Sequence, residues 1–445
     1  MLNTANLSLE QAPPISIPFR FFLTAPLFGL LAGLLMLYYG PDMVTSRWSP
    51  ATLALTHALT LGVMSMVMCG AMMQMLPVLA GSPLPRVREV GTVLHLAMII
   101  GTLGLVLGFI SSDGRWFGVA LSALAVGFAP FFVALFVALI RVKVLSPTIL
   151  GMRFAGTALL VTIGLGMLVL MARVGWLELG NPVPWVDTHL SWGLVGWVGL
   201  LLVSVAYQVV PMFHVTPEYP EWLRGYLTKG LFGLLIVWTL VGAVWPTVFY
   251  QDILMLLSLG CYVLFALQTL KLFQQKRRKV KDATLLFWRV SLVGIVLAVG
   301  LWAVMVLFSD QLSGYLTTFV LLIGAVVLLA AVAVINAMLY KIVPFLSWFH
   351  LQHRQLALMS FTVSVPHMKA FLADKHVKRQ SYLWLASALL LLLAIVVDGV
   401  LIYPGALLFV IANLYLFINL ALIYRLYRQV SGQLDEAAGP TPVAG

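Results

Sequence analysis

Hydrophobic residues in this chain fall into long uninterrupted stretches that short polar segments separate. Twelve of these stretches reach the roughly 20 apolar residues that a helix needs to cross a lipid bilayer. The pattern therefore predicts an all-α membrane protein with twelve transmembrane helices. The predicted helices lie at 18–40, 50–80, 90–111, 116–140, 150–173, 186–214, 226–246, 251–273, 285–308, 315–342, 381–400 and 403–427.

A short motif that ends in proline recurs three times, at 73–77 (MQMLP), 207–211 (YQVVP) and 340–344 (YKIVP). The three prolines are almost evenly spaced along the chain, and each comes at the end of the second of four predicted helices. Self-similarity at a fixed spacing indicates internal structural repeats. We therefore expect three pseudo-equivalent four-helix arcs around an axis along the membrane normal, covering about 18–140, 150–273 and 285–427.

The remaining segments do not suggest a second domain. Residues 1–17 are polar and predict a short cytoplasmic N-terminus, and 18–430 form the single membrane domain. The longest interruption is a cytoplasmic loop at 345–380, which could hold an amphipathic helix on the membrane surface. The segment 431–445 is expected to be a disordered tail.

The 26 Lys and Arg residues outnumber the 15 Asp and Glu residues, but their distribution matters more than the formal net charge of +11. Of these 26, only Arg47, Arg115 and Arg173 fall on the side of the predicted bundle that is opposite the two termini. The positive-inside rule then places both termini in the cytoplasm of a bacterial-type inner membrane. The expected partner is the lipid bilayer rather than nucleic acid. The sequence is also compatible with a redox partner or a further membrane subunit. The run at 276–279 is expected to act as an orientation signal beside anionic lipid.

Two histidines stand at matching places in the first two repeats. Thr56-His57 opens the second predicted helix and Thr188-His189 opens the sixth, at nearly the same distance before Pro77 and before Pro211. The tenth helix, at the same place in the third repeat, holds no histidine. Ionisable residues inside a membrane are costly and therefore mark candidate functional sites. We expect His57 and His189 to be the metal or cofactor ligands.

Methionines follow His57 at helical spacing. Met64, Met68 and Met72 are predicted to share its face if the helix turns by about 100° per residue. Thioethers suit Cu(I) and also pack well against a porphyrin. The alternative is that these methionines fill irregular gaps between helices.

Small residues follow His189 in the sixth helix. Gly193 and Gly196 are predicted to lie near its face together with Tyr207. They leave room either for a flat cofactor or for a closely packed neighbouring helix.

Other polar residues are candidates for supporting roles. Asp187 is expected either to hydrogen-bond an imidazole or to cap its helix in solvent, with Thr56 and Thr188 beside the histidines. A polar route from the cytoplasm is a further hypothesis, in which the lining residues are His95, Gln74, Gln208, His214 and Lys341.

The segment 187–211, with DTHLSW, GWVG and YQVVP, and the segment 55–59 (LTHAL) resemble the sixth and second helices of haem-copper oxidase subunit I. The C-type branch and the NnrS-like proteins of that superfamily are the most similar in arrangement, with twelve helices in three arcs. The resemblance implies that His57 ligates haem and that His189 takes the place of a copper ligand at a separate site. It does not extend to the seventh and tenth helices, where the oxidases have further histidines and this chain has none.

The sequence therefore argues against a working terminal oxidase. It favours an integral membrane protein that binds haem, copper or both, in redox chemistry, nitric oxide response or metal handling. The alternative is a membrane transporter whose substrate path is lined by His57, His189 and the methionines.

Overall fold

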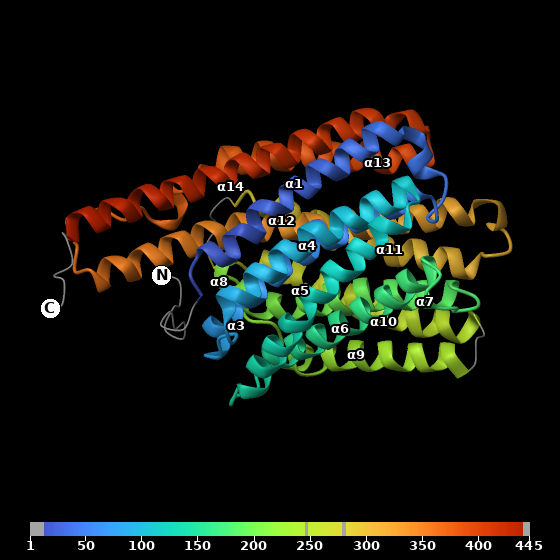
Figure 1. Ribbon diagram of the computed structural model, residues 1–445, viewed down its shortest axis with the longest axis horizontal. Helices are drawn as coiled ribbons and strands as arrows, with labels where there is room; N and C mark the ends of the chain where they lie inside the picture. The colour runs from blue at the N-terminus through green and yellow to red at the C-terminus, as the bar shows by residue number, and fades with distance from the viewer. Residues whose placement is uncertain (1–12, 245–247, 278–281, 439–445) are drawn as a thin grey trace.

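The computed structural model describes residues 13–244, 248–277 and 282–438. These residues form an all-α protein in which twelve helices are long and apolar enough to cross a membrane, as predicted (Figure 1). Most of the predicted N-terminal segment, the later part of the 276–279 run and the residues 439–445 lie outside the described residues.

Each of the three predicted units corresponds to four consecutive spans. The first unit contains α1 (Ser16–Tyr39), a second span made of α2 (Pro50–His57), η2 (Ala58–Ser65) and α3 (Met66–Ala80), α4 (Val87–Ser111) and α5 (Gly114–Arg141). The second contains α6 (Pro147–Arg173), a second span made of α7 (Val183–Ser191), η3 (Trp192–Gly199) and α8 (Leu200–His214), α9 (Glu221–Val244) and α10 (Val248–Gln274). The third contains α11 (Leu285–Leu307), α12 (Leu316–Ala357), α13 (Asp374–Val396) and α14 (Ile402–Ala438).

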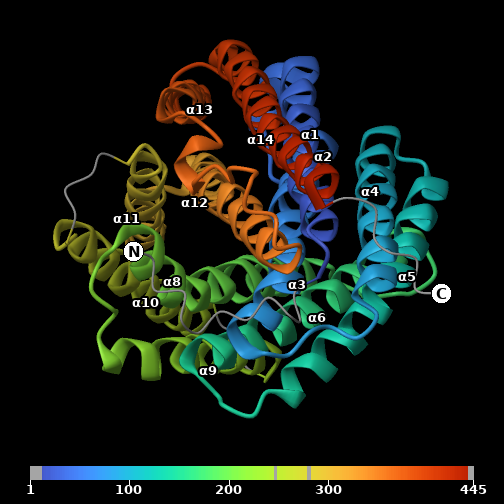
Figure 2. The same ribbon diagram turned by 90° about the vertical axis from the view of Figure 1, so that its left-hand side faces the viewer.

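The second span of each unit lies on the inside of the bundle (Figure 2). In α12 the residues 329–337 are buried on every side of the helix, which is typical of a helix in a protein core. The first and last helices close the bundle, because Gly29 and Gly33 of α1 lie directly against Asn413 and Val410 of α14. A side chain at either glycine would clash with α14, so these two glycines permit the close approach.

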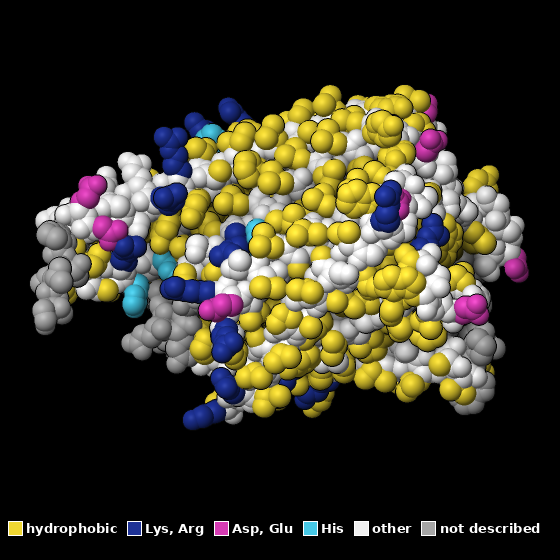
Figure 3. Space-filling view, in the orientation of Figure 1, with side chains coloured by type: hydrophobic (Ala, Val, Ile, Leu, Met, Phe, Trp, Pro, Cys, Tyr) yellow, Lys and Arg dark blue, Asp and Glu magenta, His cyan; other side chains and the backbone are white. Residues whose placement is uncertain are grey.

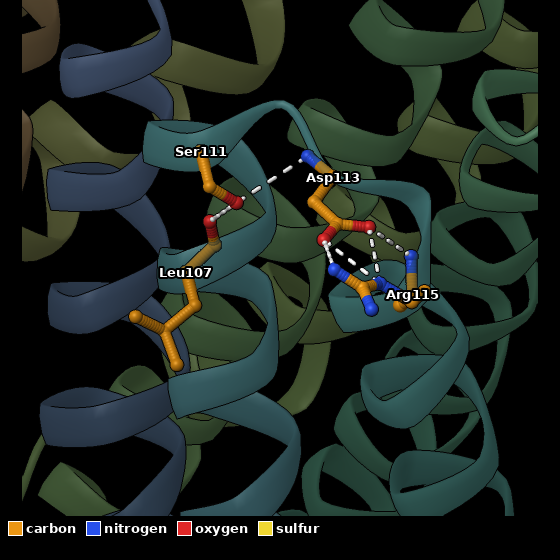
Figure 4. Close-up of polar contacts among 4 residues, drawn as sticks. All are labelled: Leu107, Ser111, Asp113 and Arg115. Atoms are coloured by element: carbon orange, nitrogen blue, oxygen red, sulfur yellow. Dashed lines mark hydrogen bonds and ion pairs between the residues drawn. The ribbon is translucent and has the colours of Figure 1, made fainter.

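The helices α4 and α5 form a tight antiparallel hairpin (Figure 4). Ser112 adopts a left-handed conformation at the end of α4, and the carboxylate of Asp113 accepts a hydrogen bond from the backbone N–H of Arg115 at the start of α5. The Arg115 side chain pairs with the same carboxylate at 2.7 Å, which holds the pKa of Asp113 below its ordinary value. The N-cap therefore fixes the turn at the end of the bundle that lies opposite α14's last residue.

Basic side chains gather at the end of the bundle where α1 begins and where α14 ends, at the left in Figure 3. We call this the basic end. Hydrophobic side chains cover the middle of the molecule in the same view. An even number of spans places the first and last helix ends on one side, so the fold agrees with the charge pattern of the sequence.

Two second spans contain a π-helical segment, which the sequence analysis did not predict. The segments η2 and η3 begin at Ala58 and Trp192, so their spacing along the chain equals that of Pro77 and Pro211. The corresponding part of α12 is plain α-helix. The first two units therefore differ from the third at the place where they carry histidine. π-Helical turns are rare, and they are frequently found at functional sites.

The two π-helices also join the first unit to the second. The indole N–H of Trp197 in η3 donates to the hydroxyl of Ser65 in η2 at 3.1 Å, and both side chains are buried. The hydroxyl of Tyr262 on α10 donates to the carbonyl of Val195 within η3. The first of these contacts joins the two second spans, and the other holds η3 against α10 within the second unit.

The predicted loop at 345–380 is wrong over its first part. The helix α12 passes through Pro344 and continues to Ala357, whereas α3 and α8 end three residues after their prolines. The extension is stable because Leu351 is fully buried and Arg354 pairs with Ser431 and Asp435 on α14. No amphipathic surface helix spans 349–375, since the chain leaves helical structure after Ala357 and re-enters it at Asp374, apart from the short 3₁₀ turn η5 (Met368–Ala370).

The prediction of a disordered tail from residue 431 is wrong for residues 431–438. The helix α14 continues to Ala438, and within it Ser431 and Leu434 are buried. The contacts of Ser431 and Asp435 with Arg354, together with the burial of Leu434, account for this order.

The packing of the α12 extension gives a first test. Leu351→Ala should destabilise the protein by about 2–5 kcal/mol, because it leaves a cavity in a buried contact. Leu356→Ala on the same extension is the matched control, since Leu356 is 61% exposed. Thermal unfolding of the purified protein in detergent would measure both. Equal unfolding midpoints for the two variants would contradict a packed extension.

Candidate functional site

His57 and His189 lie next to each other. Their ring centres are 6.4 Å apart and their planes differ by 19°. His57 is the last residue of α2 and directly precedes η2, and His189 lies in α7, three residues before η3. The resemblance to the oxidases implied two separate sites. The structure places the two imidazoles side by side, toward the end of the bundle that lies opposite the basic end, which is close enough for both to serve one bound group.

Both imidazoles are held in the same way. Nδ1 of His57 hydrogen-bonds the carbonyl of Leu53 at 2.8 Å, and Nδ1 of His189 hydrogen-bonds the carbonyl of Thr162 on α6 at 2.9 Å. A carbonyl oxygen only accepts, so Nδ1 carries the hydrogen in each ring and donates it. Each Nε2 is left with its lone pair. Histidines that bind metals commonly donate their other ring N–H in this way, which orients the ring.

The rings are close enough that both Nε2 atoms could serve one bound group. Among the described residues, no group of three or more His, Cys, Asp or Glu is placed to hold a metal ion. The pair is therefore short of ligands for zinc, which typically takes three or four from the protein. Haem iron needs only axial ligands from the protein, and copper also accepts imidazole, so both fit this donor set.

Aromatic and small residues surround the pair. The ring of Phe109 on α4 lies 5.2 Å from that of His57, at an angle of 30°. Gly166 on α6 lies against His189, where an added Cβ would be 2.9 Å from Cε1 of the imidazole. The His189 ring therefore occupies space that only a glycine leaves open.

The small-residue face of the sixth span serves helix packing. A Cβ at Gly196 would meet Ala158 of α6 at 2.8 Å, and one at Gly193 would meet Thr162 at 3.3 Å. The sequence left two interpretations open for these glycines. The structure supports the second one, a closely packed neighbouring helix. Tyr207 is buried further along the helix, where its hydroxyl donates to the carbonyl of Leu223.

The methionine face remains a prediction. Met64, Met68 and Met72 are buried in the core. The expectation that they share the face of His57 assumed an α-helical step, but Ala58–Ser65 is π-helical. A π-helix bonds residues five apart rather than four, so positions after it are rotated relative to that expectation.

The expected supporting residues do not contact the imidazoles. The carboxylate of Asp187 accepts a hydrogen bond from Arg47 at 2.9 Å, in a partly exposed ion pair that joins the first two units. The hydroxyls of Thr56 and Thr188 donate to carbonyls four residues earlier in their own helices. The groups that orient the rings are backbone carbonyls, which residue type alone does not indicate.

The predicted polar route stays a prediction. His95 pairs with the hydroxyl of Thr24 at 2.9 Å. Gln74 is buried and its amide has no hydrogen-bond partner among the described residues, whereas Gln208 is exposed. No hydrogen bond joins these three residues to one another in the described part of the chain.

The structure does join the other two residues of that route, through an acid that the sequence analysis missed. The carboxylate of Asp282, between α10 and α11, accepts hydrogen bonds from Nδ1 of His214 at 3.0 Å and from the ammonium group of Lys341 at 2.8 Å. It also accepts from the backbone and side chain of Thr284. Asp282 follows a basic run in the sequence, and that context is typical of an exposed loop rather than of a partly buried acid.

This cluster is an electrostatic link between the second and third units at the basic end. Burial by itself would raise the pKa of the Asp282 carboxyl, but the hydrogen bond from His214 and the charge of Lys341 outweigh it and hold that pKa well below its ordinary range. The ionised carboxylate is therefore the form that the fold selects.

Comparison of this chain with protein-family models finds no match, and comparison with curated proteins finds none either. The resemblance to the oxidases rests on the sequence segments described above and stays a hypothesis.

The Asp282 cluster gives a second test. Asp282→Asn should lower the free energy of unfolding at neutral pH by about 3 kcal/mol, because Lys341 and His214 lose a buried anionic partner. The folded pKa lies below the unfolded value of about 3.9, so the difference from wild type should be full at neutral pH and shrink as the pH falls below about 4. Unfolding midpoints across this range would measure it. The exposed Asp310→Asn is the control, and parallel pH curves for wild type and Asp282→Asn would contradict the role of the cluster.

Proposed function

We propose that this integral membrane protein binds haem or a copper ion through His57 and His189. The observation that carries the proposal is the matched anchoring of the two rings. Each Nδ1 is committed to a backbone carbonyl, and the two rings are 6.4 Å apart and nearly parallel. The π-helices beside both histidines, and the lack of both features in the third unit, support a shared role.

The protein's own residues would hold and orient the bound group. His57 and His189 supply the two nitrogen donors, Gly166 leaves space beside the His189 ring, and Phe109 covers the His57 ring. Haem or copper supplies one-electron redox chemistry when it is bound. This assignment places the protein in redox reactions, nitric oxide response or metal handling.

A dinuclear oxidase centre is not part of the proposal. Such a centre needs further histidines in the seventh and tenth spans, and residues 226–246 and 315–342 have none. His350 and His353 of α12 lie past Pro344, in the extension of that helix. The transport hypothesis stays a prediction, since no observation in the structure favours a substrate path over a ligand pair.

The first test removes each ligand. If one group is held between two imidazoles, His57→Ala and His189→Ala should each abolish its binding, because neither ring alone completes the pair. The measurements are the optical spectrum and the copper content of protein purified after expression with haem precursor and copper. His376→Ala is the control, since that ring hydrogen-bonds the hydroxyl of Tyr415 on a different part of the bundle.

A further variant distinguishes loss of the nitrogen donor from loss of the fold. Restored binding on addition of imidazole to His189→Gly would show that the nitrogen donor, rather than the fold, was lost. If both alanine variants keep the haem and copper content of wild type, the histidines are structural and the proposal is wrong.

A second test moves a ring without removing a donor. Gly166→Ala should weaken binding, because its Cβ would displace His189 from its position beside α6. Gly164→Ala is the matched control on the same helix, where a Cβ meets nothing within 4 Å. We expect the haem or copper content to fall in the first variant and to equal that of wild type in the second. Equal contents in both variants would argue against an oriented His189.

A further inference from the structure

A cavity of about 210 Å³ lies at the basic end, far from the histidine pair. It is bounded by Leu79 of α3, the start of α6, Tyr207 and Gln208 of α8, and Arg224 of α9. The cavity therefore lies where the second spans of the first two units end and two further helices begin.

The start of α6 forms one wall of the cavity. Ser146 caps α6 by accepting a bond from the N–H of Ile149, and Pro147 has no N–H to offer. Thr148 is the next residue. Its backbone N–H belongs to the first helical turn, where N–H groups lack a partner inside the helix.

The side chain of Thr148 adds a further donor. Thr148 is only 8% exposed and lines the cavity, and its hydroxyl has no hydrogen-bond partner among the described residues. The hydroxyl is therefore available to donate to a ligand in the cavity.

The charge of the cavity favours an anion. The guanidinium of Arg224 lines the cavity, and one of its nitrogens donates to the carboxylate of Glu218 at 2.7 Å. Glu218 is largely exposed, and the other guanidinium nitrogens have no hydrogen-bond partner among the described residues. The positive end of the α6 dipole adds to this potential, and the amide of Gln208 supplies a further donor.

We propose that this cavity binds a phosphate group. A tetrahedral oxyanion accepts from several donors at once, and arginine together with a helix N-terminus is a common way to hold one. The group would come either from the headgroup of an anionic phospholipid at the basic side of the membrane or from a free phosphate. The inference is independent of the histidine site and goes beyond the function proposed above.

The experiment uses the full-length protein purified in detergent. One arm adds phosphatidylglycerol, with phosphatidylcholine as the comparison lipid, and measures retained lipid by native mass spectrometry. The other arm adds inorganic phosphate, with chloride at equal ionic strength, and measures the thermal unfolding midpoint. Saturable binding in the lipid arm supports a headgroup, and a specific stabilisation in the phosphate arm alone supports a free phosphate.

Four variants decide whether the cavity is responsible. Arg224→Gln should weaken binding about tenfold, and the isosteric Thr148→Val roughly fivefold, because each removes a donor to the anion. Lys229→Gln is the charge control on the same helix, since Lys229 is exposed and lies outside the cavity lining. Glu218→Gln should bind as tightly as wild type or more tightly, because it frees Arg224.

Thr148→Val keeps the side-chain shape and carries the test if Arg224→Gln does not fold. The proposal is overturned if neither probe binds, if Arg224→Gln and Lys229→Gln lose affinity equally, or if Thr148→Val binds like wild type.

Discussion

Polar groups inside a membrane must find their partners within the protein, and this constraint determines the histidine site. Each buried imidazole carries one N–H that needs an acceptor, and here the acceptors are the carbonyls of Leu53 and Thr162. Satisfying that N–H fixes the tautomer, and the lone pair of Nε2 is then available to coordinate a metal. The same requirement that makes a membrane histidine costly thus orients both imidazole rings.

The three units each contain four spans, and they differ in the second span, beside His57 and His189. The π-helices keep the spacing of Pro77 and Pro211 along the chain, whereas the two histidines lie slightly closer together in sequence. The third unit has no π-helix in its second span, α12, and no histidine at the position that matches His57 and His189. Its copy of the repeated motif serves stability instead: Tyr340 accepts a hydrogen bond from Asn419, and Lys341 binds Asp282.

The twelve spans were predictable because hydrophobic length alone identifies them, and the histidine pair was predictable because ionisable residues are rare in such helices. The π-helices were not, since their residues have ordinary hydrophobic sequences. The course of α12 past Pro344 depends on contacts of Leu351 and Arg354 with distant parts of the chain, which local sequence does not contain. The closeness of His57 and His189 was missed for another reason, because the resemblance to the oxidases implied separate sites.

The distance between the two imidazoles is a property of the interface between the first and second units. His57 comes from one unit and His189 from the other, and the buried bond between Ser65 and Trp197 lies between their π-helices. The Asp282 cluster joins the second and third units at the opposite end, and the glycines of α1 join the third unit to the first. A ligand pair is effective only when its geometry is held to a fraction of an ångström. The described residues make contacts at each of the three interfaces between units, and the histidine pair lies at the first of them.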